Sequence, residues 1–223
     1  MSLTLGFDIY GTLIDPHGVV EQLSLKLGPR ANDFSLVWRQ KQLEFTFRRA
    51  LMRNYRNFVV CTRDALDYTD LVMKTGLDEA SKQTLMDAYR ELPAYGDVEQ
   101  SLQKIAAQGH RLFAFSNGLA DAVQHLLDCA GIASYFEGVV SVDSIQTFKP
   151  NPDVYQYFVD STHSQLDQCW LVSSNSFDVI GAVSMGMKAA WLQRSREAIF
   201  DPCEIVPSLT ITSLADLSAE LKS

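Results

Sequence analysis

The sequence predicts an α/β fold in which a parallel sheet is covered on both faces by helices and a helical subdomain follows the first strand. Short apolar runs, each ending in a polar or glycine-containing turn, alternate with amphipathic segments. This alternation is typical of a parallel sheet that is buried on both faces. Between residues 16 and 92 the alternation stops, because this stretch has helical patterns and no convincing strand.

Each element is expected from its own pattern. The apolar runs at residues 3–8, 111–116, 138–142, 169–173 and 189–193 predict strands. Amphipathic segments at residues 96–108, 120–130, 152–161 and 177–185 predict the helices between them, and a last helix at 213–221 follows a short run at 209–212. In the insertion, helices are expected at 19–27, 34–51, 62–75 and 79–91. We therefore predict a sheet domain of residues 1–15 and 93–223 and a helical cap subdomain of residues 16–92.

Composition limits the classes of function. The chain has 223 residues and a formal net charge of −8. This charge argues against non-specific nucleic-acid binding, and it means that an anionic substrate needs cations placed locally around it. The N-terminal residues do not resemble a secretory signal, and no stretch reaches the roughly 20 apolar residues that span a bilayer. We expect a cytoplasmic protein that does not associate with membranes.

The cysteines give no metal motif. No two of the four lie within metal-ligand spacing, which argues against a zinc site, and we expect them to be reduced, small and buried: Cys61, Cys129, Cys169 and Cys203.

The expected site lies beyond the carboxyl ends of the strands, where open parallel sheets bind ligands. Polar residues end the runs or follow them at this edge: Asp8, Ser116, Asn117, Lys149, Ser173, Ser174 and Asn175. Asp8 is the most informative, because a carboxylate at the end of a buried strand and just before a glycine turn is exposed at the strand tip. An aspartate in a turn or at a helix cap would give the same local pattern.

The segment Phe7-Asp8-Ile9-Tyr10-Gly11-Thr12-Leu13 resembles the nucleophile motif of the haloacid dehalogenase superfamily. Other motifs of that superfamily follow in order: Ser116-Asn117-Gly118, Phe148-Lys149-Pro150, and Ser173-Ser174-Asn175-Ser176-Phe177-Asp178. The stretches at residues 38–44 and 62–69 are similar to its (S)-2-haloacid dehalogenases of type II. The resemblance covers nearly the whole chain and implies a Rossmann-like core with a cap subdomain.

The resemblance also separates two kinds of chemistry. Phosphatases of the superfamily need magnesium, which prefers several carboxylate and water ligands. Here Tyr10 stands at the second carboxylate position of the first motif, and Ser174 stands where an aspartate is common. Without the metal, a phosphate dianion would meet an anionic nucleophile at a cost of several kcal/mol, to order of magnitude. We therefore expect no metal and no cofactor, and a substrate that is attacked at carbon.

For a 2-haloacid, the resemblance implies a two-step reaction. Asp8 attacks C2, expels halide and forms an ester, and water then attacks the ester carbonyl. Lys149 is expected beside Asp8 to keep it ionised, because it lies between Phe148 and Pro150 in a loop at a strand end; the alternative is a surface lysine. Asp178 is expected to orient or activate the water, with Asn175 and Ser173 as helpers, although it could instead be a carboxylate at a helix N-terminus.

The remaining roles carried over by resemblance are contacts to substrate and halide. Thr12 and Ser116 are expected to donate hydroxyls to Asp8 and to the substrate carboxylate. Arg39, Asn117 and the edge of Phe177 would receive the halide, although Arg39 alone could be a surface salt bridge with Glu44. The pocket would be completed by Tyr10, Gln40, Leu43, Phe58 and Tyr155; for Leu43 and Phe58 the alternative is ordinary core packing.

Alternatives remain open at this point. The chain could open another carbon electrophile, such as a strained cyclic amino acid, with the same residues. A phosphatase and a non-catalytic binding protein fit the motifs less well. Val59 stands where many relatives have tryptophan, and Phe177 stands where some relatives have it. Both changes are expected to alter pocket size and hence chain-length preference. Relatives of this type are commonly homodimers, so a homodimer is expected.

Overall fold

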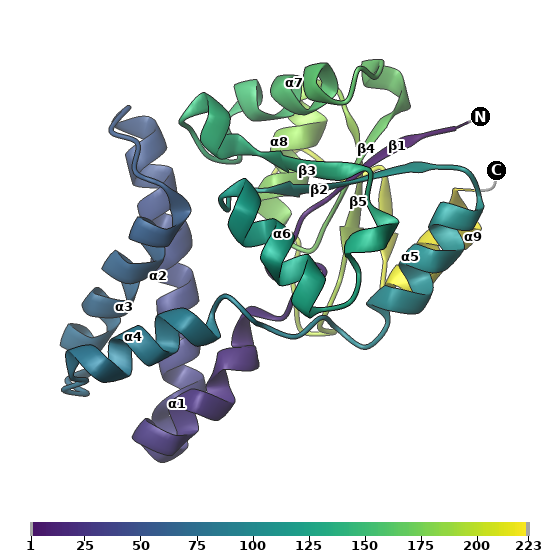
Figure 1. The fold of residues 1–223 in the computed structure, drawn as a ribbon. Helices are drawn as coiled ribbons and strands as arrows, with labels where there is room; N and C mark the ends of the chain where they lie inside the picture. Colours follow the sequence, from purple (N-terminus) through teal and green to yellow (C-terminus); the bar gives the residue numbers. More distant parts are fainter. Residues whose placement is uncertain (1, 222–223) are drawn as a thin grey trace.

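The computed structural model describes residues 2–221, which form a six-stranded sheet flanked by helices (Figure 1). The sheet has the order β3-β2-β1-β4-β5-β6, and every neighbouring pair is parallel. β1 lies in the middle of the sheet and its four residues are all buried, as expected for a strand covered on both faces. The strands are β1 Thr4–Phe7, β2 Arg111–Ser116, β3 Gly138–Ser141, β4 Cys169–Ser173, β5 Lys188–Leu192 and β6 Leu209–Ile211.

The helices of the sheet domain form two layers. Figure 1 shows α5 (Val98–Ala107), α6 (Ala120–Cys129) and α9 (Leu214–Glu220) on one side of the sheet, and α7 (Pro152–Ser161) and α8 (Ser176–Met185) on the other. α5 packs against α9, and α7 packs against α8. Aromatic side chains fill the space between sheet and helices; Phe115, for example, is buried against Phe158 with ring centroids 4.8 Å apart. The predicted α/β class is confirmed.

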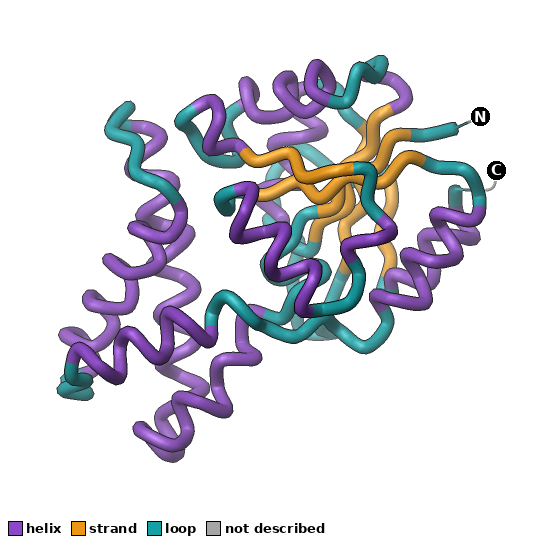
Figure 2. Tube along the Cα trace, in the orientation of Figure 1, coloured by secondary structure: helices purple, strands orange, loops and turns teal. Residues whose placement is uncertain are grey.

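Four helices between β1 and α5 lie beside the sheet domain (Figure 2). They are α1 Val20–Leu27, α2 Ala31–Leu51, α3 Phe58–Met73 and α4 Glu79–Ala88. α2 packs along α3, and the buried Trp38 indole donates to the Thr62 carbonyl oxygen at 2.9 Å. α3 begins four residues before the predicted start at 62, because the Asn57 side chain accepts the Val60 N–H at 3.1 Å and caps the helix there. We call residues 16–92 the helical insertion.

Two expectations need correction. The run at 209–212 was not assigned to the sheet, but Leu209–Ile211 pairs with β5 as the edge strand. Cys61 and Cys169 are buried as expected, whereas Cys129, the last residue of α6, and Cys203, in a loop, are exposed.

Within residues 2–221 no helix is both long and apolar enough to cross a bilayer. Short 3-10 turns complete the fold at Pro16–Val19, Gly28–Arg30, Ala133–Tyr135, Val142–Ile145 and Leu166–Gln168.

Candidate active site

The strand order reverses between β1 and β4, and Asp8 lies at this point. Asp8 follows the last residue of β1, and its N–H donates to the Val172 carbonyl oxygen of β4 at 3.0 Å. Gly11 then adopts φ +90°, a left-handed conformation that only glycine takes without strain, and it turns the chain away from the sheet. Asp8 therefore lies at the crevice where doubly wound sheets bind ligands.

The two oxygens of the Asp8 carboxylate have different surroundings. Oδ2 accepts three hydrogen bonds, from Thr12 Oγ1 at 2.8 Å, Asn175 Nδ2 at 2.7 Å and Ser173 Oγ at 3.2 Å. Oδ1 accepts one, from Lys149 Nζ at 3.2 Å. Four residues from three parts of the chain therefore hold this carboxylate, and Oδ1 keeps the greater share of free lone pairs.

Lys149 lies fully inside the protein. Its ammonium group donates to Asp8 Oδ1, to Asp178 Oδ2 at 2.8 Å and to the Phe115 carbonyl oxygen at 2.9 Å, which uses all three of its hydrogens. Burial by itself would lower the pKa of Lys149, but the carboxylates of Asp178 and Asp8 outweigh it and hold that pKa above its usual value. The surface-lysine alternative is wrong, and Lys149 is a buried cation between two carboxylates.

Asp178, in the first turn of α8, is completely buried. Burial raises the pKa of its carboxyl to about 6, with Asp8 adding to the rise and Lys149 opposing it. The Tyr155 hydroxyl donates to Asp178 Oδ1 at 2.9 Å. A side chain at Gly181 would clash with this hydroxyl, so glycine is needed there.

Tyr155 was expected to contact substrate, and the structure corrects this. Its side chain has no solvent exposure and lies behind Asp178, because the helices α7 and α8 pack together there. It supports the carboxylate instead of lining the cavity.

Arg39, in the middle of α2, reaches the same site from the helical insertion. Its Nη1 donates to Gln42 Oε1 at 2.7 Å and its Nη2 to the Tyr10 carbonyl oxygen at 3.0 Å. Glu44 pairs instead with Lys41 and Arg48. The salt bridge between Arg39 and Glu44 is therefore absent, and within residues 2–221 no carboxylate lies within 4.0 Å of the guanidinium.

Sequence reasoning missed the residues that orient Arg39. Gln42 is fully buried; its Nε2 donates to Thr62 Oγ1 at 2.5 Å, and its Oε1 also accepts the Tyr89 hydroxyl at 3.0 Å. The spacing of Arg39 and Gln42 could have indicated their contact, because residues three apart on a helix lie side by side. Gln40 points elsewhere: it is exposed and does not line the cavity described next.

A small cavity lies between the sheet edge and the helical insertion. Its lining residues were all singled out from the sequence: Asp8, Tyr10, Arg39, Leu43, Phe58, Asn117, Lys149, Asn175 and Phe177. Ser116 is buried nearby, but its Oγ accepts the Gly118 N–H at 3.0 Å and makes no bond to Asp8. The turn after β2 thus uses Ser116 for its own backbone, which corrects its expected contact with Asp8.

A larger groove of about 490 Å³ adjoins this cavity and shares Tyr10 and Phe58 with it. Its other walls come from α3, α4 and the start of α6, and they include Val59, Met86 and Leu119. Tyr10 and Phe58 lie between the two spaces, and their ring centroids are 5.2 Å apart.

Comparison with known proteins identifies the family. Residues 6–192 match the model of the haloacid dehalogenase-like hydrolases. The chain belongs to this family. It is 35% identical over 210 residues to the (S)-2-haloacid dehalogenase of Pseudomonas sp. (strain YL), covering 94% of this chain and 90% of that protein. It is also 35% identical over 207 residues to haloacetate dehalogenase H-2 of Moraxella sp. (strain B), and this match covers 93% of this chain and 92% of that protein.

Solved structures agree with this assignment. The L-2-haloacid dehalogenase of Xanthobacter autotrophicus, in a structure with chloropropionic acid covalently bound, superposes with a TM-score of 0.91 at 31% identity. The match covers 100% of this chain and 99% of that chain. The fold, the sheet topology and the inserted helices are therefore those of a haloacid dehalogenase-like hydrolase.

Many hydrolases with this fold use magnesium, and the donor set here does not fit that ion. Lys149 Nζ bonds both Asp8 and Asp178, so a cation already bridges the two carboxylates. Tyr10 supplies no carboxylate, and Ser174 Oγ donates to the Gly11 carbonyl oxygen at 2.6 Å. Magnesium demands near-octahedral oxygen ligands, which these residues do not supply.

Proposed function

We propose that this chain hydrolyses L-2-haloacids to D-2-hydroxy acids through an ester on Asp8, without a metal ion. The observation that carries this proposal is Arg39, a guanidinium that lines the same cavity as the Asp8 carboxylate and has no carboxylate partner among residues 2–221. A cation left unneutralised near a nucleophile suits a reaction that releases an anion. The named dehalogenases at 35% identity support the same activity.

The first step uses the asymmetry of Asp8. Oδ1, which has one hydrogen-bond donor, attacks C2 of the substrate from the side opposite the halogen, and the carbon–halogen bond breaks as the ester bond forms. The halide departs towards Arg39, with the Asn117 amide and the electropositive ring edge of Phe177 completing its site. Attack from the opposite side inverts C2, so an L substrate gives a D product.

The second step uses the three donors on Oδ2. After ester formation this oxygen is the ester carbonyl, and Thr12, Ser173 and Asn175 already point hydrogens at it. When water adds to the carbonyl carbon, negative charge develops on Oδ2 and these donors stabilise it. We infer that Asp178 takes the proton of the water, because it is the other carboxylate bonded to Lys149. The bond between the Asp8 carboxyl carbon and Oδ1 then breaks, Oδ1 leaves with the product and takes up the proton, and the oxygen of the water remains in the Asp8 carboxylate.

The pH dependence of turnover follows from Asp178. Because burial raises the pKa of this carboxyl to about 6, it is protonated below that pH and can neither accept a proton nor hold Lys149. We expect kcat to fall tenfold per pH unit below about pH 6 and to level off above it. Tyr155→Phe removes a hydrogen bond that favours the ionised carboxyl and should move the acid limb up by about one pH unit. An acid limb that stays unmoved in this variant would argue against Asp178 as the titrating group.

Chain-length preference is expected to depend on the groove behind Tyr10 and Phe58. Val59→Trp on α3 fills part of the groove, so kcat/KM for a six-carbon 2-haloacid should drop about tenfold relative to 2-chloropropionate. Leu25→Trp, exposed on α1 of the helical insertion and outside the groove, is the matched control. Equal effects of both variants on the ratio would show that the groove does not receive the substrate chain.

The activity itself is tested by halide release from L- and D-2-chloropropionate and from chloroacetate, with and without a chelator. We expect halide from the L enantiomer and from chloroacetate, none from the D enantiomer, and no effect of the chelator. If no halide appears but a strained cyclic amino acid is opened, the proposed leaving group is wrong while the role of Asp8 stands. Magnesium-dependent hydrolysis of a phosphate ester would overturn both.

We also propose that the protein is a homodimer, located in the cytoplasm. Support comes from large apolar side chains exposed on the helical insertion: Leu36, Leu51, Met52, Tyr68, Leu71 and Val72. Light scattering coupled to size exclusion should give twice the chain mass, and a monomer mass would refute the dimer.

A further inference from the structure

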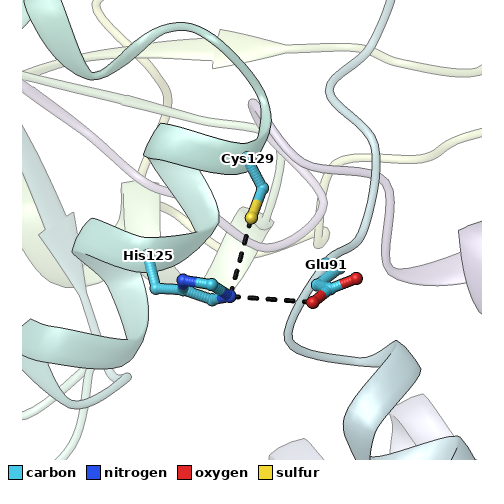
Figure 3. A group of neighbouring side chains, drawn as sticks. All are labelled: Glu91, His125 and Cys129. Carbon is cyan, nitrogen blue, oxygen red and sulfur yellow. Dashed lines mark hydrogen bonds and ion pairs between the residues drawn. The ribbon is translucent and has the colours of Figure 1, made fainter.

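Three side chains with metal-binding atoms meet on the surface, outside the active site (Figure 3). His125 and Cys129 lie one helical turn apart on α6 of the sheet domain, and Glu91 comes from the segment that follows α4. His125 Nε2 lies 3.5 Å from Cys129 Sγ and 3.8 Å from Glu91 Oε1. The three ligand atoms all lie within 4.8 Å of one another.

These separations match the coordination geometry of zinc. With Zn–N and Zn–O bonds of about 2.1 Å and a Zn–S bond of about 2.3 Å, neighbouring ligand atoms of a tetrahedral ion lie about 3.4 to 3.6 Å apart. The distances from Nε2 to the thiol and to the carboxylate are already close to this range. An ion placed between the three atoms would need small rotations of exposed side chains only.

The three groups are also available for binding. All three residues are exposed, and the Cys129 thiol is not in a disulfide. Within the described part of the chain, Sγ, Nε2 and Oε1 have no hydrogen-bond or ion-pair partner besides one another. A surface ion pair between His125 and Glu91 would contribute little to the stability of the fold, and it would not account for the Cys129 thiol beside them.

We propose that Glu91, His125 and Cys129 bind Zn²⁺, with water in the fourth position. An imidazole nitrogen and a thiolate select this ion over Mg²⁺ and Ca²⁺, which prefer oxygen ligands. The spacing between the cysteines does not predict this site, because only Cys129 takes part in it. The other two ligands are a histidine and a glutamate.

The position of the site gives it a mechanical consequence. Glu91 belongs to the connection that leads from the helical insertion back to the sheet domain, whereas His125 and Cys129 belong to the sheet domain itself. A bound ion therefore joins the connection to α6 and restrains movement of the insertion over the cavity that contains Asp8 and Arg39. Hinge movements of this kind depend on a few residues at the ends of elements.

Zinc binding is tested on the full chain with Zn²⁺ alone, in competition with a chromogenic chelator. We expect one ion per chain with a dissociation constant of about 1 μM or lower. His125→Ala and Cys129→Ser should each weaken binding at least about tenfold, whereas Cys203→Ser, at an exposed cysteine elsewhere, should not. Unchanged binding in the double variant His125→Ala/Cys129→Ser, or no binding at about 100 μM Zn²⁺, would overturn the site.

The restraint is tested by hydrogen exchange, which is independent of the proposed dehalogenase activity. Zn²⁺ should slow amide exchange in residues 88–96, and Mg²⁺ and Ca²⁺ should not. Glu91→Gln removes the carboxylate ligand that the connection supplies. The slowing of exchange in residues 88–96 should therefore disappear, whereas His125 and Cys129 should still bind zinc, but more weakly than in wild type. Zinc binding without slower exchange in wild type would refute the restraint.

Discussion

Asp8→Asn is expected to abolish halide release, with a fall in kcat of at least about 10⁴-fold. The amide oxygen can still accept the hydrogen bonds that Thr12, Ser173 and Asn175 give to Oδ2, so the fold should be retained. The amide carries no negative charge and cannot form the ester. Steady-state halide release, with mass spectrometry to exclude deamidation back to aspartate, measures the effect.

The control is Asp201→Asn, which neutralises an exposed carboxylate far along the chain and should leave kcat unchanged. A single turnover of wild type in oxygen-18 water adds a second check. Because water attacks the carbonyl carbon of Asp8, the label should enter Asp8, and the first-turnover product should be unlabelled. Substantial activity of the intact Asn variant, or label in the first product, would contradict the ester mechanism.

Lys149→Met is expected to reduce both activity and stability. The side chain is replaced by one of similar length, but the carboxylates of Asp8 and Asp178 lose the cation between them. Breaking such a buried pair costs about 3 to 5 kcal/mol of unfolding free energy, and we expect kcat to fall at least about 10³-fold. Urea denaturation followed by circular dichroism measures the stability term.

The pH dependence of this deficit has a definite sign. The pKa of Asp178 is already raised to about 6 by burial, and removal of the lysine raises it further. A carboxyl whose folded pKa exceeds its unfolded pKa destabilises the fold as it ionises, so the deficit should be largest above about pH 7 and shrink towards pH 5. Lys149→Met/Asp178→Asn should regain stability at neutral pH without regaining activity. A deficit that grows as the pH falls would show that repulsion is not its cause.

The sequence was sufficient for features that depend on local pattern. Alternating apolar runs and helical periods predicted the sheet and its helices, because strands buried on both faces need continuous apolar segments. The motif around Asp8 and the polar residues at the other strand ends predicted the crevice, because all strands of a parallel sheet end at the same edge. Tyr10 in place of a second carboxylate predicted that the site would not fit magnesium.

Other features depended on which side chains meet in space. The sequence left Arg39 as either a salt bridge or a halide site, and only the packing of α2 showed that Glu44 takes other partners and that buried Gln42 holds the guanidinium. The same is true of Tyr155, which lies behind Asp178, and of Gln40, which faces solvent. A residue's position in a motif fixes its backbone location, whereas its role depends on helix rotation and on neighbours from distant parts of the chain.

The surface cluster shows this difference most clearly. Glu91 is 34 residues from His125 in the sequence, and no spacing rule connects them, yet the return of the chain from the helical insertion places them together. The sequence by itself determined the sheet, the crevice and the nucleophile Asp8, because these follow from periodicity and strand ends. The tertiary structure decided which polar groups meet: Lys149 with two carboxylates, Arg39 with Gln42 and the Tyr10 carbonyl oxygen, and His125 with Glu91 and Cys129 at the surface, since Coulomb interactions and hydrogen bonds depend on distance in space.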